Sequence, residues 1–278
     1  MTRRPLDRRA LFASGAAAAL LAATGLSAGT LPKRGGKLRL ALSGASRSDD
    51  WVRGNGLFMQ VARLGLVYET LTEIAPDGTL RAGLAVDWRG SPDARHWEFT
   101  LRQGVMFHDG VPFTARDVAA SAAGFEDGEV RVLDAHRVSF NLEIGDPNLP
   151  MKLASPDYYI SAAHAMGAGI GTGLYRATHF APGQQLLAER AEVHWKDGHA
   201  GWFDRVELVS IPSEAVRAQA VAEYLVDGAD IADATVLTGL NDIAVWDGQA
   251  VSRSVAMPAT LGRGVFDDLR APQRWWGA

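Results

Sequence analysis

Between positions 101 and 118 the chain reads Leu101-Arg-Gln-Gly-Val-Met-Phe-His-Asp-Gly-Val-Pro-Phe-Thr-Ala-Arg-Asp-Val118. Asp109 and Gly110 predict a tight turn in the middle of this stretch, because glycine accepts the positive dihedral that such a turn requires. Thr114 and Asp117 stand three residues apart, the spacing at which two polar side chains cap the start of a helix. The stretch therefore predicts a hairpin that is followed directly by a capped helix.

The apolar residues of this stretch indicate how it packs. Val105, Phe107 and Phe113 flank the predicted turn, and we expect all three side chains to be buried and to hold the hairpin to the helix. We expect the helix to run to Ala123. His108 stands at the turn itself, where a single histidine is more typical of a hydrogen-bonding element than of a catalytic or metal-binding group.

Outside this stretch, the spacing of apolar residues predicts further elements. Period-two alternation predicts strands at residues 37–42, 85–88, 96–102, 137–142, 184–190 and 205–211. Helical spacing predicts helices at residues 57–71, 148–153 and 213–226, the last with Ser213 as its N-cap and Asp227-Gly228 as its end. Polar or glycine-rich composition predicts loops at residues 45–56 and 167–173. Strands and helices interleave, so the predicted fold class is α/β with a mixed sheet.

Several blocks of the sequence together resemble one protein family. The stretch 101–118 is similar to the family pattern LRxGVxFHDGxPFTAxDV, and Leu80-Arg-Ala-Gly-Leu-Ala-Val-Asp-Trp88 is similar to the strand that precedes it. Further blocks agree in order: Tyr68-Glu69-Thr70-Leu71, Gly171-Thr172-Gly173-Leu174-Tyr175 and the run 203–230. Over roughly residues 36–235 the chain resembles the solute-binding proteins of ABC transporters in the dipeptide, oligopeptide and nickel class, family 5.

The resemblance implies a fold and a function. It implies a lobe of the type II periplasmic-binding-protein kind at residues 36–235, and a periplasmic substrate-binding component that delivers peptides or similar small solutes to an ABC permease. Family members are longer, because two lobes close over the ligand, so we expect residues 236–278 to be a tail that begins a missing second lobe. Since one lobe leaves a ligand half exposed, we expect weak dipeptide binding unless a second chain supplies the other wall.

An alternative function stays open at this point. A single-lobe remnant could have lost clamp binding and act as an interaction or assembly partner of another exported protein. The tail pair Trp275 and Trp276 would then be its contact patch.

The N-terminus has the order of a secretory signal. Arg3, Arg4, Arg8 and Arg9 precede an apolar, alanine-rich run at residues 10–23, and small residues follow up to Ala28. Arg8-Arg9 followed by apolar residues is typical of the twin-arginine export motif. We therefore interpret residues 1–28 as a twin-arginine-type signal peptide and expect a periplasmic location.

Composition and motifs exclude several classes of function. The formal net charge of −4 does not favour a nucleic-acid partner, and the lack of cysteine excludes disulfides and thiolate metal sites. The glycine series at 167–173 lacks both the dinucleotide fingerprint and the P-loop lysine. His194 and His199 lie five residues apart, off one helical face and without a third ligand nearby. We therefore expect no enzymatic activity, no catalytic residues, no metal site and no cofactor.

Loops at strand ends supply the candidate ligand-binding residues. Mixed α/β sheets place their sites there, and aromatic side chains offer a large contact area. Trp51 in the first loop and the pair Tyr158-Tyr159 in a later one are the candidates. The alternative interpretation of all three is an aromatic residue of the core or of a lobe interface.

Overall fold

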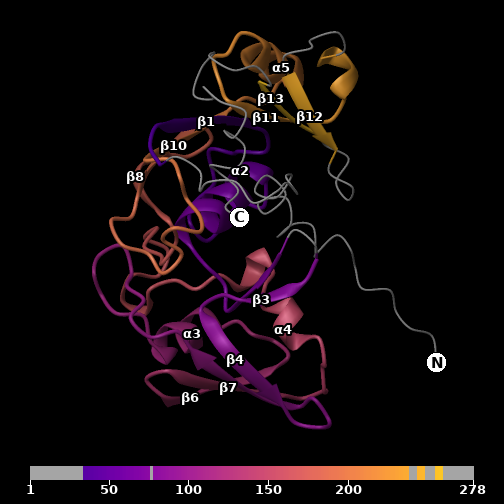
Figure 1. Ribbon diagram of the computed structural model, residues 1–278. Helices are drawn as coiled ribbons and strands as arrows, with labels where there is room; N and C mark the ends of the chain where they lie inside the picture. The colour runs from indigo at the N-terminus through magenta and orange to yellow at the C-terminus, as the bar shows by residue number, and fades with distance from the viewer. Residues whose placement is uncertain (1–33, 76–77, 238–242, 248–253, 259–278) are drawn as a thin grey trace, which may run out of the picture.

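The computed structural model describes residues 34–75, 78–237, 243–247 and 254–258 and has a mixed α/β fold (Figure 1). The expected signal peptide at residues 1–28, with Arg8 and Arg9, lies outside the described residues. So does the end of the chain with Trp275 and Trp276. No helix of the described part is long and apolar enough to cross a membrane.

A seven-stranded mixed sheet forms one part of the molecule, drawn at the top of Figure 1. Its central strand β1 (Lys37–Leu42) runs parallel to both neighbours, and the remaining pairs are antiparallel. The strands follow the order β12 (Ile243–Asp247), β13 (Ser254–Pro258), β11 (Gly228–Ile231), β1, β10 (Arg205–Ser210), β9 (Gln185–Arg190) and β8 (Tyr175–Ala181). Strand β1 is buried on both faces: Leu38, Leu40 and Leu42 pack in one core and Ala41 packs in another.

A four-stranded antiparallel sheet forms the second part, drawn at the bottom of Figure 1. Its order is β4 (Ala85–Gly90), β5 (His96–Leu101), β7 (Arg137–Leu142) and β6 (Gly128–Asp134). A two-stranded ribbon of β2 (Thr72–Ile74) and β3 (Leu80–Ala82) lies before it in the chain. The inward residues Phe99, Val138 and Phe140 form a core that is separate from the one under β1.

Short helices complete the fold. They are α2 (Leu57–Gln60), which continues as the π-helix η1 (Val61–Val67), then α3 (Ala115–Ser121), α4 (Leu149–Lys152) and α5 (Glu214–Ala222). Single 3-10 turns are η2 (Pro156–Tyr158), η3 (Ala163–Ala165) and η4 (Ala234–Leu237).

The stretch 101–118 folds as its sequence predicts. Val105, Phe107 and Phe113 are each at most 5% exposed, and the rings of the two phenylalanines meet edge to face at 6.2 Å. The Asp117 carboxylate accepts a hydrogen bond from the Thr114 backbone N–H at 2.8 Å, so the predicted cap of α3 is confirmed. The helix ends at Ser121, two residues before the predicted end.

Two predicted helices are too long. The helix predicted at 57–71 ends at Val67, because Tyr68 is extended and Glu69 forms a β-bridge with Ile160. The helix predicted at 213–226 ends at Ala222. Near that end Tyr224 takes a positive φ of 59°, which a right-handed helix cannot continue.

The expected caps of that second helix are also wrong in detail. Ser213 stands at the N-cap of α5 but makes no side-chain cap bond. Gly228 begins strand β11 instead of ending the helix. Strands β12 and β13 fall within residues 236–278. Strand β13 pairs with β11 and β12 pairs with β13, so the sheet continues past residue 235.

Candidate functional site

The first loop, which carries Trp51, is held by a buried arginine. Arg63 of η1 is 7% exposed and donates from Nη1 to the carbonyl oxygen of Gly54 at 2.8 Å and from Nη2 to that of Asp50 at 3.1 Å. It also donates to the carbonyl of Arg53. Because one guanidinium satisfies three loop carbonyls, the loop has a defined shape without regular secondary structure.

An aromatic cluster fixes the Trp51 ring. The ring lies 4.9 Å from that of Phe180 and 6.0 Å from that of Tyr68, and the rings of Tyr68 and Tyr159 lie 4.6 Å apart. The Tyr159 hydroxyl donates to the Trp51 carbonyl at 2.9 Å. Aromatic contacts of this kind contribute about 0.5–1.5 kcal/mol each beyond burial. These contacts hold the indole ring of Trp51 in one position.

The glycine-rich bend at 167–173 packs directly against these groups. A Cβ atom on Gly169 would lie 2.5 Å from the Trp51 ring, and one on Gly173 would lie 2.2 Å from the carbonyl oxygen of Leu66. No side chain fits at either distance, so glycine is needed there for close approach of the backbone. The loop predicted at residues 167–173 is confirmed.

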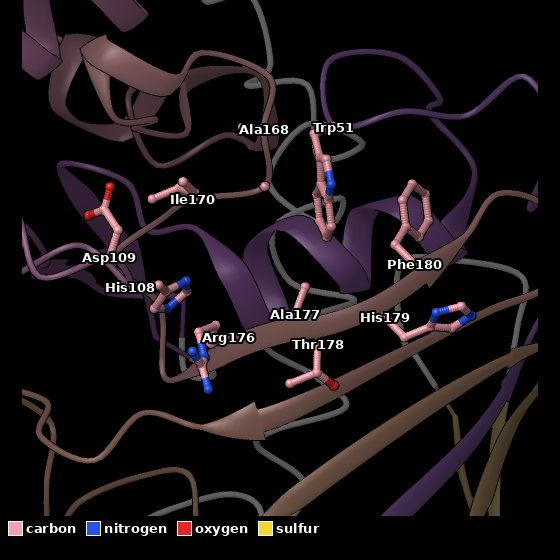
Figure 2. A pocket seen from close by; sticks show the side chains of 11 residues that line it. Trp51, His108, Asp109, Ala168, Ile170, Arg176, Ala177, Thr178, His179 and Phe180 are labelled. Atoms are coloured by element: carbon pink, nitrogen blue, oxygen red, sulfur yellow. The ribbon is translucent and has the colours of Figure 1, made fainter.

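These segments, together with the hairpin and β8, border an open pocket of about 390 Å³ (Figure 2). It is lined by Trp51, by His108 and Asp109 of the hairpin, by residues 168–170 of the bend and by residues 176–180 of β8. Its volume lies within the range of about 300–1,000 Å³ for small-molecule sites. Figure 2 shows Trp51 and Phe180 facing each other at one end, with Asp109 and His108 at the other end.

Some polar side chains of the pocket already have a hydrogen-bond or ion-pair partner within the protein, and others do not. His108 donates from Nε2 to the carbonyl of Gly173 at 2.7 Å, and burial lowers the pKa of this histidine, so it is neutral at pH 7. The Asp109 carboxylate lies 2.6 Å from Nε2 of His164. Burial by itself would raise the pKa of Asp109, but the hydrogen bond to His164 keeps this pKa below its ordinary value. Arg176 is exposed and has no carboxylate partner among the described residues. The charged side chain of the pocket that lacks an ion-pair partner among the described residues is therefore the positively charged Arg176.

A buried charge cluster anchors the far end of the bend. The Glu69 carboxylate accepts from Oγ1 of Thr172 at 2.9 Å and from Nε1 of Trp195 at 3.2 Å, and it pairs with Nζ of Lys196 at 3.1 Å. His194 donates from Nε2 to the carbonyl of Thr172 at 2.9 Å. Every contact joins segments that are distant in the sequence, so the cluster ties the loop after β9 to the bend.

The charges of this cluster stabilise one another. Burial by itself would raise the pKa of Glu69, but the charge of Lys196 and the hydrogen bonds from His194 and Trp195 lower it to about 2. Burial would lower the pKa of Lys196, whereas Glu73 and Glu69 raise it. Both groups therefore stay charged at pH 7.

The structure brings together two of the three candidate residues. Trp51 lines the pocket, and the Tyr159 hydroxyl donates to the Trp51 carbonyl. Tyr158 lies apart, in the core of the four-stranded sheet, where its ring lies 6.2 Å from that of Phe125. Tyr158 ends the 3-10 turn η2 and Tyr159 follows it in extended backbone, and the two rings pack against different cores, so the pair does not serve one site.

Sequence reasoning missed the part of the pocket that β8 supplies. Residues 176–180 belong to a strand that we did not predict. A bulge between Ala177 and His179 shifts its phase, so the buried Tyr175 and the half-buried Phe180 do not fit one alternation. Without a regular alternation, the sequence of this strand shows only one aromatic residue, Phe180, beside polar residues, and that pattern is too weak to predict a binding site.

The described residues hold no group of three or more histidine, aspartate or glutamate side chains placed to bind a metal ion. His108 takes the hydrogen-bonding role expected of it, through its bond to Gly173.

Known proteins to which this chain is similar in sequence include solute-binding and periplasmic-binding proteins. A family model described as bacterial extracellular solute-binding proteins, family 5 Middle, matches residues 79–270. The chain is 35% identical over 101 residues to the nickel-binding periplasmic protein of Escherichia coli (strain K12), covering 36% of this chain and 17% of that protein. It is 28% identical over 234 residues to a probable peptide ABC transporter periplasmic-binding protein of Sinorhizobium fredii, covering 72% of this chain and 44% of that protein.

Solved structures agree on the fold. The periplasmic binding protein DppA from Helicobacter pylori, in complex with the peptide STSA, has a TM-score of 0.66 at 21% identity and matches 77% of this chain and 51% of its own. A nickel ABC transporter structure from Bacillus halodurans has a TM-score of 0.65 at 21% identity, and the match covers 76% of this chain and 46% of that chain. The fold is that of type II periplasmic binding proteins, and the chain spans about half the length of these structures. None of these four relatives is described as an assembly factor, so the interaction-partner alternative gains no support from them.

Proposed function

Because the chain belongs to the bacterial extracellular solute-binding proteins of family 5, we propose that it is the periplasmic component of an ABC transporter and captures peptides. The ligand passes from it to an ABC permease. Relatives described as binding nickel or a peptide define the two ligand classes that need to be distinguished.

The guanidinium of Arg176, which has no carboxylate partner among the described residues, is the observation that favours a peptide. A guanidinium attracts a carboxylate and repels a bare metal cation. The rings of Trp51 and Phe180 at the other end of the pocket offer an apolar surface. A carboxylate at one end and an apolar side chain at the other match the chemistry of a short peptide. In this proposal the edge of Trp51 that lines the pocket faces the ligand, and Tyr159 holds Trp51 through the hydrogen bond to its carbonyl.

The first experiment compares ligand classes on the same protein. The tetrapeptide Phe-Ala-Ala-Ala and nickel(II) chloride are titrated separately by calorimetry into the millimolar range. We expect heat of binding from the peptide. A ligand at 100 times its Kd also adds about 2.7 kcal/mol to stability, which a thermal melt detects. Binding of nickel but not of the peptide would contradict the peptide proposal.

Replacing Arg176 tests the carboxylate contact. We expect Arg176→Gln to weaken binding of Phe-Ala-Ala-Ala about tenfold, since a charge-assisted hydrogen bond contributes about 1.5–3 kcal/mol and an exposed one less. The peptide's C-terminal amide should bind wild type and variant equally. Arg89→Gln on β4, also exposed, is the matched control and should change nothing. An equal loss for acid and amide would show that Arg176 does not contact the carboxylate.

Export by the twin-arginine route is part of the proposal. It rests on Arg8-Arg9 and the alanine-rich run at residues 10–23. We expect the double change Arg8→Lys and Arg9→Lys to leave uncleaved protein in the cytoplasm, as judged by cell fractionation. The same change at Arg3 and Arg4 is the control and should leave export intact. Normal periplasmic accumulation of the Arg8 and Arg9 variant would rule out this route.

A further inference from the structure

Strand β6 is an open edge of the four-stranded sheet. It stands last in the order of that sheet, and among the described residues its main chain makes no backbone hydrogen bond outside the ladder with β7. In an antiparallel pair, alternate residues turn both N–H and C=O away from the partner strand. The outward groups of β6 can therefore pair with one more strand.

Apolar side chains of this edge lie open to solvent. Val132 is 42% exposed and Leu133 is 43% exposed. Edge strands that remain unpaired are commonly protected by bulges. The bulge of β6 lies between Val132 and Asp134, so it leaves residues 128–132 regular and available for pairing.

The side chains of this regular run divide between two faces. Val130 lies opposite the buried Phe140 of β7, so Val130 and its second neighbours in the strand face the core. Glu129 and Arg131 face the other way, where Nη2 of Arg131 lies 2.6 Å from Oε2 of Glu129. Their side chains are 59% and 62% exposed. The edge thus presents one acidic and one basic side chain, two residues apart on one face.

These charges select one register for a second copy of the same strand. A two-fold axis normal to the sheet places residues of the same face opposite each other. An axis at Glu129 or at Arg131 would set two like charges opposite each other, which is destabilising. An axis at Val130 sets Glu129 of each copy opposite Arg131 of the other. In that register the two Val130 side chains meet, and Val132 lies opposite Gly128, which has no side chain to block it.

We propose that two copies of this protein associate by pairing their β6 strands in the register centred on Val130. The two four-stranded sheets then continue into each other, with an ion pair on either side of the axis. Strand β6 lines no part of the pocket, and Figure 1 draws it at the bottom of the molecule, away from β8. Association therefore leaves both pockets open and does not depend on the ligand.

The opposite edge of the same sheet, β4, is less suited to this pairing. Its register with β5 shifts between Ala85 and Asp87, and the N–H of Ala85 already donates to the carbonyl of Leu71 at 2.8 Å. Only residues 87–90 remain regular. Asp87 and Arg89 nevertheless repeat the pattern of an acid and an arginine two residues apart, so β4 supplies the matched control.

Charge reversal tests the register. A five-residue strand pair is smaller than the standard interface of about 1,600 Å², so we expect a weak monomer–dimer equilibrium at about 10–500 µM in sedimentation velocity. Glu129→Arg and Arg131→Glu each turn two attractive pairs into two repulsive ones, and we expect each to weaken association about tenfold. Both should keep the wild-type melting temperature, because an exposed ion pair contributes little to folding.

Mixing the two variants supplies the decisive measurement. In an equimolar mixture every arginine faces a glutamate of the other copy, so association should return to the wild-type level. The double variant Glu129→Arg with Arg131→Glu should also associate by itself, for the same reason. Arg89→Glu on β4 should leave the equilibrium unchanged.

The outcomes are distinct. Loss of association in each single variant and its return in the mixture would establish the register. A wild-type protein that stays monomeric over the whole concentration range would overturn the proposal. So would a dimer that survives Glu129→Arg or one that is lost with Arg89→Glu. None of these measurements involves a ligand, so failure here leaves the proposed function standing.

Discussion

Phe107→Ala is expected to lower the free energy of unfolding by about 3–5 kcal/mol, the usual cost of truncating a buried phenylalanine. Phe107 is 3% exposed and packs edge to face on Phe113, and its backbone N–H donates to the carbonyl of Val111 at 2.9 Å across the hairpin. Its removal leaves a cavity where the hairpin meets α3. For a chain of this size the melting temperature should fall on the order of 10 °C.

The neighbouring residue provides the control for this experiment. Met106 lies on the same hairpin but is 48% exposed, so Met106→Ala should change stability by no more than about 0.5 kcal/mol. Urea denaturation followed by circular dichroism measures both variants. Equal stability of wild type and Phe107→Ala would mean that the hairpin does not pack as described.

Glu69→Gln is expected to cost about 3 kcal/mol of folding stability. The carboxylate is 5% exposed and lies among Thr172, Trp195 and Lys196. Breaking a buried ion pair by removing one partner typically costs about 3–5 kcal/mol, because the other charge stays behind. The lower end applies here, since Lys196 keeps its second partner, Glu73.

The same variant has a defined pH dependence. The pKa of Glu69 falls from an ordinary value of 4.5 to about 2 on folding, so the charged form is favoured in the folded protein. A depressed pKa contributes stability that is complete above about pH 4.5 and declines as the pH falls toward 2. The difference in stability between wild type and Glu69→Gln should therefore shrink over that interval.

A second carboxylate on the same lysine is the matched comparison. Glu73 also pairs with Lys196, but its side chain is 33% exposed, so Glu73→Gln should cost less than about 1 kcal/mol. Urea titrations at pH 7 and near pH 3.5 measure both variants. A cost for Glu69→Gln that is the same at both pH values would contradict the assigned ion pair.

Local sequence patterns predicted the elements whose residues follow one period. The strands at 37–42 and 137–142 begin and end where the alternation does. The turn at Asp109-Gly110 and the cap formed by Thr114 and Asp117 are decided by neighbours within a few residues. Such features need no information from the rest of the chain.

Patterns failed where distant contacts replaced them. Tyr68 and Leu71 continue the helical spacing of residues 57–67, yet the chain becomes extended there because Glu69 bridges to Ile160 and is bound by the loop after β9. The bulge in β8 likewise removes the alternation that would have revealed that strand. Tertiary contacts outweigh a preference that amounts to less than about 1 kcal/mol per residue.

The sequence by itself determined the family, the mixed α/β class, the hairpin with its buried Val105, Phe107 and Phe113, and Trp51 as a candidate contact residue. Only the tertiary structure decided the pocket, because its walls come from the first loop, the hairpin, the bend and β8, and no periodicity links them. It also separated Tyr158 from Tyr159 and placed Arg176 at the pocket without a carboxylate partner among the described residues. Burial and charge pairing at such a site depend on which segments meet in space, and that is a property of the folded chain.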